Sequence, residues 1–328
     1  MKIVIIGAAG MIGRKLAERL AADGKIGETP IEKLHLVDVV SPPLPETTSE
    51  VIGETADLSQ SGTAETLIRE RPDIIFHLAA IVSGEAEADF EKGYRINLDG
   101  TRDLFEAIRT AHQTDGYTPR VIFASSLAVF GAPFPDEIPD DYHLTPLTSY
   151  GTQKAISELL LSDYSRRGFL DGIGIRLPTI CIRPGTPNKA ASGFFSNILR
   201  EPINGKSAVL PVDESVRHWF ASPRSAVGFF VHAASLDLSK LGARRNLTMP
   251  GLSATVGDEI EALRHVVGQE AVDRIEREPD ATIDKIVEGW PTSFAAKRAE
   301  ELGFTAEASF DEIVQVYLED EMNDAARS

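Results

Sequence analysis

Tyr150 and Lys154 are a tyrosine and a lysine four residues apart, a combination that can move a proton. On a helix, residues at this spacing share one face, so both side chains can reach a common point. A phenol with its ordinary pKa of about 10 is a poor base at neutral pH, but a neighbouring ammonium group favours the phenolate. Tyrosine–lysine pairs with this spacing also occur on helices as solvated or packed side chains. A catalytic role for this pair therefore needs support from other residues.

Ser125 and Ser126 end the apolar run of residues 121–124. If that run is a strand of an open α/β sheet, its carboxyl end is the edge where ligands bind. The hydroxyl of Ser126 can then hold a substrate oxygen while Tyr150 moves its proton. We therefore expect Ser126, Tyr150 and Lys154 to be catalytic, and Ser126 and Tyr150 to contact the substrate as well.

Three glycines with the spacing G-x-x-G-x-x-G lie between an apolar run at residues 3–6 and a helical pattern. In this context the glycines permit a tight turn and a close approach of the backbone to a pyrophosphate, which the first amides of the helix face. A plain tight turn has the same spacing, so the motif needs support. The dinucleotide-binding residues expected here are Gly7, Gly10, Met11, Ile12 and Gly13.

Asp38 provides that support, because it ends the second apolar run at the usual distance from the glycines. A carboxylate there can accept hydrogen bonds from the ribose hydroxyls of the adenosine, whereas it would repel a 2′-phosphate. Val39 and Val40 supply no cation for such a phosphate. The pattern favours NAD over NADP, and Asp57 with Leu58 could hold the adenine edge.

Short β-branched runs alternate with helical patterns through the first half of the chain, which is typical of a parallel sheet with helices on both faces. The runs are residues 3–6, 34–37, 50–55, 74–78, 121–124 and 173–176, and the helical patterns are residues 11–23, 63–71, 93–111 and 149–167. Later helices are expected at residues 193–200, 223–235, 256–267 and 310–320. We predict a doubly wound α/β domain at residues 1–176 and a smaller, interleaved substrate-binding domain at residues 177–328, with segments returning to the sheet.

The composition excludes several classes of protein. A chain of 328 residues with a net charge of -17 repels nucleic acid and anionic membranes, so a small molecule is the expected partner. The run at residues 3–6 imitates a short signal peptide, but the glycines after it favour a strand and turn. No run approaches the ~20 apolar residues that span a bilayer. We expect a cytoplasmic enzyme, and Cys181 to be a packed, inert thiol.

The histidines give little support to a metal site, because none of the seven has a partner at ligand spacing. Within Phe76-His77-Leu78 the imidazole is expected to be a hydrogen-bonded group of the core. Asn97 is expected to stabilise the local backbone, with a relay role as the alternative.

In their order along the chain these motifs resemble the extended short-chain dehydrogenase/reductase family, in its sugar-nucleotide epimerase and dehydratase group. The matching segments are the glycine turn, Asp38, Asp57-Leu58, residues 77–80, residues 97–101, residues 125–131, Tyr150 with Lys154, and residues 293–304. The resemblance implies a Rossmann sheet, NAD as cofactor and often a homodimer. It places Ala79, Ala80, Ser125, Tyr150, Lys154, Pro178 and Thr179 at the cofactor, and lets Lys154 hold the nicotinamide ribose and lower the pKa of Tyr150.

Two segments depart from the pattern of enzymes that bind nucleoside diphosphate sugars. Many of those enzymes have an asparagine where this chain has Pro178-Thr179. They also have an Arg-Asp-aromatic segment that ends in paired acids, where this chain reads Arg217-His218-Trp219-Phe220-Ala221-Ser222-Pro223, with the arginine kept and the acids gone. A later Arg-x-Gly-Asp element is at best Arg277-Glu278-Pro279-Asp280, and Phe130 replaces a common tyrosine. The diphosphate-binding elements are therefore incomplete, although the redox residues are present.

The segments at residues 177–185 and 188–193 resemble the branch of the family that contains D-erythronate dehydrogenases. That branch implies oxidation of the C2 hydroxyl of a small sugar acid, D-erythronate to 2-oxo-tetronate, with release of NADH. The carboxylate of such a substrate needs a cation, and Arg183, Lys189 and Arg217 are the candidates. The alternatives are a nucleoside-diphosphate-sugar epimerase or dehydratase with tightly bound NAD, and a non-catalytic NAD sensor. The sensor is disfavoured because sensing needs no proton-transfer residues.

Overall fold

The computed structural model describes residues 1–185 and 192–322, which form two compact units. The first unit comprises Met1–Val129, Pro146–Leu177 and Val227–Thr248, and the second comprises Phe130–Thr145, Pro178–Ala226 and the chain from Met249 onward. The chain therefore passes between the units several times. Phe130–Thr145 belongs to the second unit, although it precedes two segments of the first.

The first unit is built on a seven-stranded sheet whose pairings are all parallel, in the order β13-β9-β7-β6-β1-β4-β5. The strands are β1 (Lys2–Ile6), β4 (Lys33–Asp38), β5 (Glu50–Thr55), β6 (Ile74–His77), β7 (Arg120–Ser126), β9 (Asp171–Leu177) and β13 (Asn246–Thr248). Parallel sheets are covered on both faces, which explains why the inner strands read as continuous apolar runs. The predicted doubly wound α/β fold is confirmed, and β13 is a late segment that returns to the sheet.

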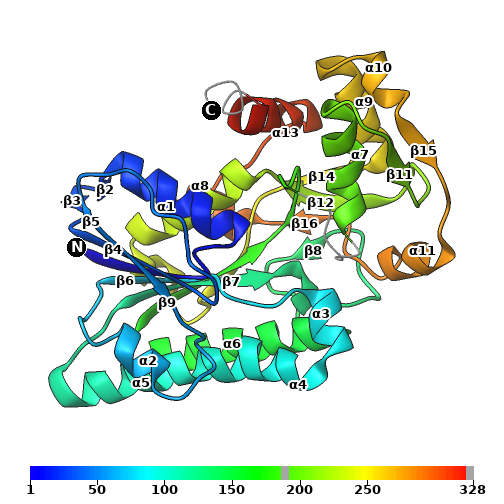
Figure 1. Ribbon diagram of the computed structural model, residues 1–328. Coiled ribbons are helices and arrows are strands. Elements are labelled where there is room, and N and C mark those ends of the chain that lie inside the picture. The colour runs from blue at the N-terminus through cyan, green and yellow to red at the C-terminus, as the bar shows by residue number, and fades with distance from the viewer. Residues whose placement is uncertain (186–191, 323–328) are drawn as a thin grey trace. The chain divides into compact units, whose positions relative to one another are not determined.

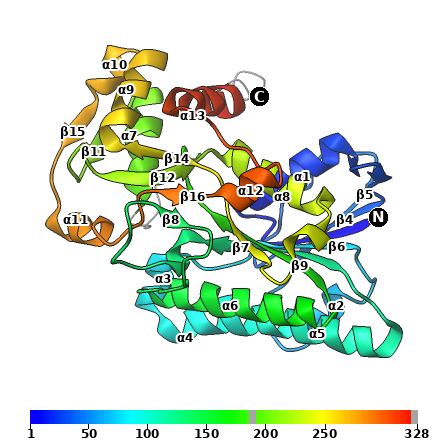
Figure 2. The same cartoon turned by 180° about the vertical axis from the view of Figure 1, so that it is seen from behind.

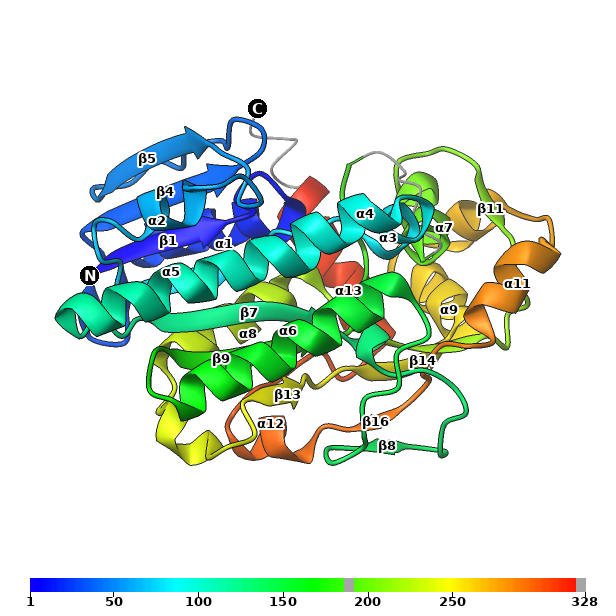
Figure 3. The ribbon, with the colours of Figure 1, turned by 90° about the horizontal axis from the view of Figure 1, so that it is seen from below.

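Helices cover both faces of this sheet (Figures 1 and 3). On one face lie α1 (Met11–Asp23) and the first-unit part of α8 (Pro223–Ser235), whose Phe230 ring meets Phe76 edge to face. The other face carries α2 (Thr63–Leu67), α5 (Gly100–Asp115) and α6 (Ser149–Arg166), which share one apolar cluster with the strands.

Some elements of the first unit differ from the sequence expectation. The helix expected at residues 93–111 consists of α4 (Phe90–Gly93), a π-helical turn (Tyr94–Asp99) and α5, which ends where Gly116 takes a left-handed conformation. The helix expected at residues 63–71 ends at Leu67. Three further elements are too short to show a period in the sequence: β2 (Lys25–Ile26), β3 (Thr29–Pro30) and α3 (Ser83–Ala88).

The second unit contains small sheets and short helices around an apolar cluster of its own. Its three-stranded sheet is β10 (Thr179–Ile180), β12 (Arg217–Ala221) and β14 (Leu252–Thr255), and its two-stranded pairs are β11 (Ala208–Leu210) with β15 (Ile275–Arg277) and β8 (Ile138–Pro139) with β16 (Phe294–Ala295) (Figure 2). The helices are α7 (Gly193–Ile203), α9 (Val256–Val266), α10 (Gln269–Val272), α11 (Ala281–Val287), α12 (Lys297–Glu301) and α13 (Phe310–Tyr317). None of the helices described is long and apolar enough to cross a membrane.

Candidate active site

The glycine turn after β1 is so tightly packed that side chains do not fit in it. A Cβ atom on Gly7, whose φ is +94°, would lie 2.7 Å from the backbone nitrogen of Ala79, and one on Gly13 would lie 2.1 Å from the carbonyl oxygen of Gly7. Helix α1 starts directly after Gly10 with no side-chain cap and no acidic residue in its first turn. The first amides of α1 are thus not satisfied by a local carboxylate, and this cradle fits the pyrophosphate of a dinucleotide.

Asp38 lies beside this turn at the end of β4. Its carboxylate accepts hydrogen bonds from the backbone amides of Ala9, at 2.9 Å, and Val39, at 2.7 Å. A carboxylate has about four lone-pair positions, so capacity remains for ribose hydroxyls. Val39 and Val40 are largely exposed and provide no cation. The geometry matches the pattern on which the NAD expectation was based.

The remaining first-unit candidates for the cofactor surround the turn. Ala79 and Ala80 follow β6, and the close approach of Gly7 places the Ala79 backbone against the turn. Burial opposes ionisation of Asp57, but hydrogen bonds from Ser59 and Gln60 hold the pKa of this carboxyl below its ordinary value. Leu58 next to it is buried. We keep these residues as proposed cofactor contacts.

Helix α6, which has Tyr150 in its first turn, begins against the chain that directly follows β7 and Ser126. Thr148 caps the helix by accepting a hydrogen bond from the Gly151 amide at 3.0 Å. A Cβ atom on Gly151 would lie 2.0 Å from the carbonyl oxygen of Ala128, so the helix approaches the chain after β7 as closely as a glycine permits. The hydroxyl of Ser126 accepts from the Ala128 amide at 3.2 Å.

Lys154 lies on the same face of α6 as Tyr150, and only 2% of its surface is exposed. Its Nζ donates to the carbonyl oxygen of Ala124 on β7 at 2.7 Å and lies 5.8 Å from the centroid of the Tyr150 ring. Burial lowers the pKa of Lys154 to about 7, and the charge of Glu158 acts in the opposite direction. The Glu158 carboxylate thus offsets part of the cost of burying the ammonium form, which is the form that favours a neighbouring phenolate.

A buried network that sequence reasoning missed lies one turn further along α6. The carboxylate of Glu158 accepts two hydrogen bonds from Arg176 on β9, at 2.7 and 2.9 Å, and one from the Ser125 hydroxyl at 2.6 Å. Glu158 is 1% exposed and Arg176 is 8% exposed. Glu158 follows Lys154 by four residues, and this second i+4 step on the helix face of Tyr150 and Lys154 was the available signal. The Ser125 hydroxyl, a predicted cofactor contact, is committed to this network.

His77 and Asn97 have the structural roles expected of them. His77 is buried, its Nε2 lies 2.8 Å from the Thr101 hydroxyl, and burial lowers the pKa of its imidazole to about 3. Asn97 bonds to both backbone groups of Ile81 and donates to Gln153 at 2.8 Å. Asn97 thus connects the chain after Ala80 to helix α6.

The other predicted contacts lie in the second unit. Arg183 donates to the carbonyl oxygen of Ile180 and to the Ser192 hydroxyl, both at 3.0 Å. Arg217 is 45% exposed, donates to the Ser253 carbonyl oxygen and lies 3.9 Å from Asp258. Pro178 is buried and Thr179 is half-buried. Lys189 lies outside the described residues.

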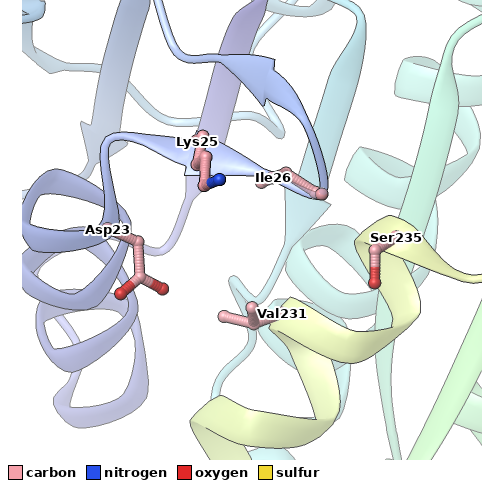
Figure 4. A pocket seen from close by; sticks show the side chains of 6 residues that line it. Asp23, Lys25, Ile26, Val231 and Ser235 are labelled. Atoms are coloured by element: carbon pink, nitrogen blue, oxygen red, sulfur yellow. The ribbon is translucent and has the colours of Figure 1, made fainter.

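Other features do not contribute to the candidate site. Cys181 is fully buried, and burial raises the pKa of its thiol. Within residues 1–185 and 192–322, no three His, Cys, Asp or Glu side chains are grouped as a metal would require. A cavity of about 250 Å³ lies at the carboxyl-terminal end of α1, opposite to its glycine turn (Figure 4). It is lined by Asp23, Lys25, Ile26, Gly27, Val231 and Ser235, none of which is a predicted site residue.

Alanine at Gly13 is expected to abolish NAD binding and to destabilise the first unit, because its Cβ would collide with the Gly7 carbonyl oxygen. The matched control is Gly228→Ala in helix α8, where a Cβ meets no atom within 4 Å. That change should raise the free energy of unfolding by about 0.5 to 1 kcal/mol. Urea unfolding measures the change in stability, and NAD titration measures the change in binding. Similar behaviour of the two variants would contradict the assignment of the glycine turn as the binding site of the pyrophosphate.

Comparison with known proteins agrees with this geometry. The family model described as the NAD dependent epimerase/dehydratase family matches residues 3–228. A D-erythronate dehydrogenase of Cupriavidus necator is 46% identical over 325 residues, which cover 98% of each chain. A D-erythronate dehydrogenase of Haemophilus influenzae is 43% identical over 322 residues, covering 98% of this chain and 100% of that protein.

A solved structure is also similar over nearly the whole chain. It is described as the nucleoside-diphosphate-sugar epimerase from Agrobacterium tumefaciens, and it is 68% identical with a TM-score of 0.97. The match covers 98% of this chain and 95% of that one. The relatives therefore share the fold but have names from two different reaction classes.

Proposed function

This chain belongs to the NAD dependent epimerase/dehydratase family, and we propose that it is a dehydrogenase that oxidises the C2 hydroxyl of D-erythronate to give 2-oxo-tetronate. The observation that carries this proposal is the identity of 43% and 46%, over 98% of the chain, to two D-erythronate dehydrogenases. NAD is the cofactor, as the family description states and as Asp38 and the glycine turn predict.

NAD, when bound, supplies the hydride acceptor, and the residues of the chain handle the proton and the substrate oxygen. Tyr150 as phenolate takes the proton from the C2 hydroxyl, while Ser126 donates a hydrogen bond that orients the same oxygen. Lys154 holds the nicotinamide ribose, and its ammonium favours the phenolate form of Tyr150. Helix α6 and strand β7 position these groups, since Lys154 is bonded to Ala124 on that strand.

The substrate carboxylate needs a cation, because an unpaired carboxylate is costly to bury in so acidic a protein. Arg183 and Arg217 of the second unit are our candidates, together with Lys189. A guanidinium can bind a carboxylate through two parallel N–H donors, which is why arginine suits such a role.

A nucleoside-diphosphate-sugar epimerase is the second candidate function, because the 68% identical structure has that name. The second unit gives this alternative little support. The segment that contains β12 keeps Arg217, but it ends in Ser222 and Pro223, both buried, where the sugar-nucleotide pattern has paired acids. Arg277 is paired with Glu214, to which it donates at 2.8 Å, so its charge is already compensated.

A substrate panel followed at the NADH absorbance tests the proposed function. D-Erythronate and neighbouring C4 and C5 aldonates are expected to reduce NAD, whereas UDP-glucose and UDP-galactose should neither be epimerised nor stabilise the fold. Turnover of a UDP-sugar without net NADH, with the aldonates inert, would replace the dehydrogenase by the epimerase. Binding of NAD with no turnover of any substrate would favour a sensor.

Asp38→Ala is expected to weaken NAD binding and to reduce the preference for NAD over NADP. The reason is that the carboxylate both holds the Ala9 amide of the turn and repels a 2′-phosphate. Titration of wild type and variant with both nucleotides measures the preference. An unchanged preference in Asp38→Ala would remove Asp38 from the cofactor site.

A homodimer and a cytoplasmic location stay predictions from the sequence. The net charge of -17 agrees with a small-molecule partner and disfavours nucleic acid and anionic membranes. Sedimentation of the purified chain gives its oligomeric state directly.

A further inference from the structure

The two segments that depart from the sugar-nucleotide pattern are bonded to each other. Thr179 lies in the first departure, and His218 lies in the second, 39 residues later. The Thr179 hydroxyl oxygen is 2.7 Å from Nε2 of His218. Thr179 pairs with Phe220 where β10 meets β12, so the bond joins neighbouring strands of one sheet. A substitution of Thr179 or of His218 therefore removes or alters the same hydrogen bond.

The direction of this hydrogen bond follows from the other nitrogen of His218. Its Nδ1 lies 2.9 Å from the carbonyl oxygen of Pro291, and a carbonyl oxygen can only accept, so Nδ1 carries the proton. His218 is 5% exposed, and burial lowers the pKa of its imidazole to about 4, so the ring is neutral at physiological pH. A neutral imidazole has one N–H, and Nε2 must therefore accept the hydrogen of the Thr179 hydroxyl.

The surroundings of His218 fix its ring in this orientation. The Phe195 ring stacks on the imidazole at 5.5 Å with an angle of 4° between the planes. Phe220 meets it edge to face at 5.5 Å, and the Trp290 ring lies at 5.3 Å. An imidazole packed among three aromatic rings cannot turn to exchange its two nitrogens without repacking the core of the second unit.

Thr179 can therefore offer a ligand only acceptor positions. Its single hydrogen is committed to His218, while its oxygen keeps lone pairs and the residue is half-buried. Two acceptors do not bond, so this oxygen does not bind the carboxylate of a sugar acid. It fits a donor, and hydroxyl groups are the donors of a sugar acid.

We propose that Thr179 determines specificity by accepting a hydrogen bond from a substrate hydroxyl at C3 or C4, and that His218 is the positioning residue that fixes Thr179 as an acceptor. This inference rests on the proposed sugar-acid dehydrogenase function. It assigns Thr179 to the substrate instead of the cofactor, because Thr179 lies in the second unit with the candidate cations Arg183 and Arg217. The cations then take the carboxylate and Thr179 takes a hydroxyl.

The test compares D-erythronate with its 3-deoxy and 4-deoxy analogues on wild type and Thr179→Val. One analogue should lose about tenfold in kcat/KM on wild type, the worth of one hydrogen bond. Thr179→Val keeps the side-chain shape, and its kcat/KM for D-erythronate should fall by a similar factor. The variant should then have nearly equal kcat/KM values for D-erythronate and for the affected deoxy analogue. Equal discrimination by wild type and Thr179→Val would overturn the inference.

Variants of His218 test the positioning role. His218→Phe keeps the aromatic packing and loses the acceptor, so it should reproduce part of the Thr179→Val effect. His218→Gln keeps an acceptor, so this variant should still discriminate between D-erythronate and the affected deoxy analogue. Adding His218→Phe to Thr179→Val should cost little more than Thr179→Val alone, since both remove one bond. Additive losses in the double variant would contradict the positioning role.

Two further measurements show whether a negative result contradicts the role of Thr179 or the proposed dehydrogenase function. The Kd of NAD should stay within about twofold in every variant, and a parallel loss of NAD affinity would show that the donor is the nicotinamide carboxamide, which overturns the substrate assignment. If wild type forms no NADH from D-erythronate, the proposed function itself fails and the inference fails with it. NADH formation without discrimination between the analogues overturns the inference alone.

Discussion

Replacing Tyr150 with phenylalanine is expected to lower kcat by about 10²- to 10⁴-fold, the usual contribution of a general base. The variant keeps the ring beside Lys154 and loses only the hydroxyl group that we propose as the general base. NAD binding should therefore persist, so that the loss appears in kcat and not in the Kd of the cofactor. Steady-state NADH formation and NAD titration measure the two quantities separately.

Two other variants make this result specific. Tyr164→Phe, on the same helix, removes a hydroxyl that bonds to Glu106 outside the site and should leave kcat unchanged. Lys154→Ala should weaken both turnover and NAD binding, because the proposed role of the ammonium includes the ribose. Near-normal turnover in Tyr150→Phe would show that another group takes the proton.

Glu158→Ala is expected to destabilise the protein by about 3 to 5 kcal/mol, because it leaves the Arg176 guanidinium buried without its carboxylate. The Ser125 hydroxyl loses its acceptor in the same variant. Urea unfolding gives the change in the free energy of unfolding. A change below 1 kcal/mol would mean that the network tolerates water or rearranges.

Asp163→Ala provides the matched control on the same helix. Asp163 pairs with Arg166 at 2.6 Å, but both side chains are more than half exposed, so its removal should change stability by no more than about 0.5 kcal/mol. The double variant Glu158→Gln with Arg176→Met removes both buried charges and should recover much of the loss. Failure of the double variant to recover would assign the cost to packing instead of charge.

The parts of the site that could be predicted from the sequence are those set by local spacing. Tyr150 and Lys154 are four residues apart on one helix, and the three glycines span a single turn, so their geometry follows from the elements that contain them. The parallel sheet could be predicted because its strands are buried on both faces and read as continuous apolar runs. Family membership then confirmed NAD as the cofactor.

Contacts between distant parts of the chain could not be predicted in this way. The partners of Glu158 lie 18 and 33 residues away, and 39 residues separate Thr179 from His218. Only the fold brings such residues together. The short strands of the second unit, such as the two residues of β10, give no periodic signal at all. The π-helical turn before α5 was missed for a related reason, since a single wide turn does not change the apolar pattern of the helix.

The central claim is that this chain transfers a hydride from C2 of a sugar acid to NAD with net release of the reduced cofactor. Incubation with NAD and D-erythronate deuterated at C2 tests this transfer directly. The account predicts one equivalent of 2-oxo-tetronate for each NADH, with the deuterium found in the NADH. Absence of deuterated NADH, together with epimerisation of a UDP-sugar by the same protein, would contradict it.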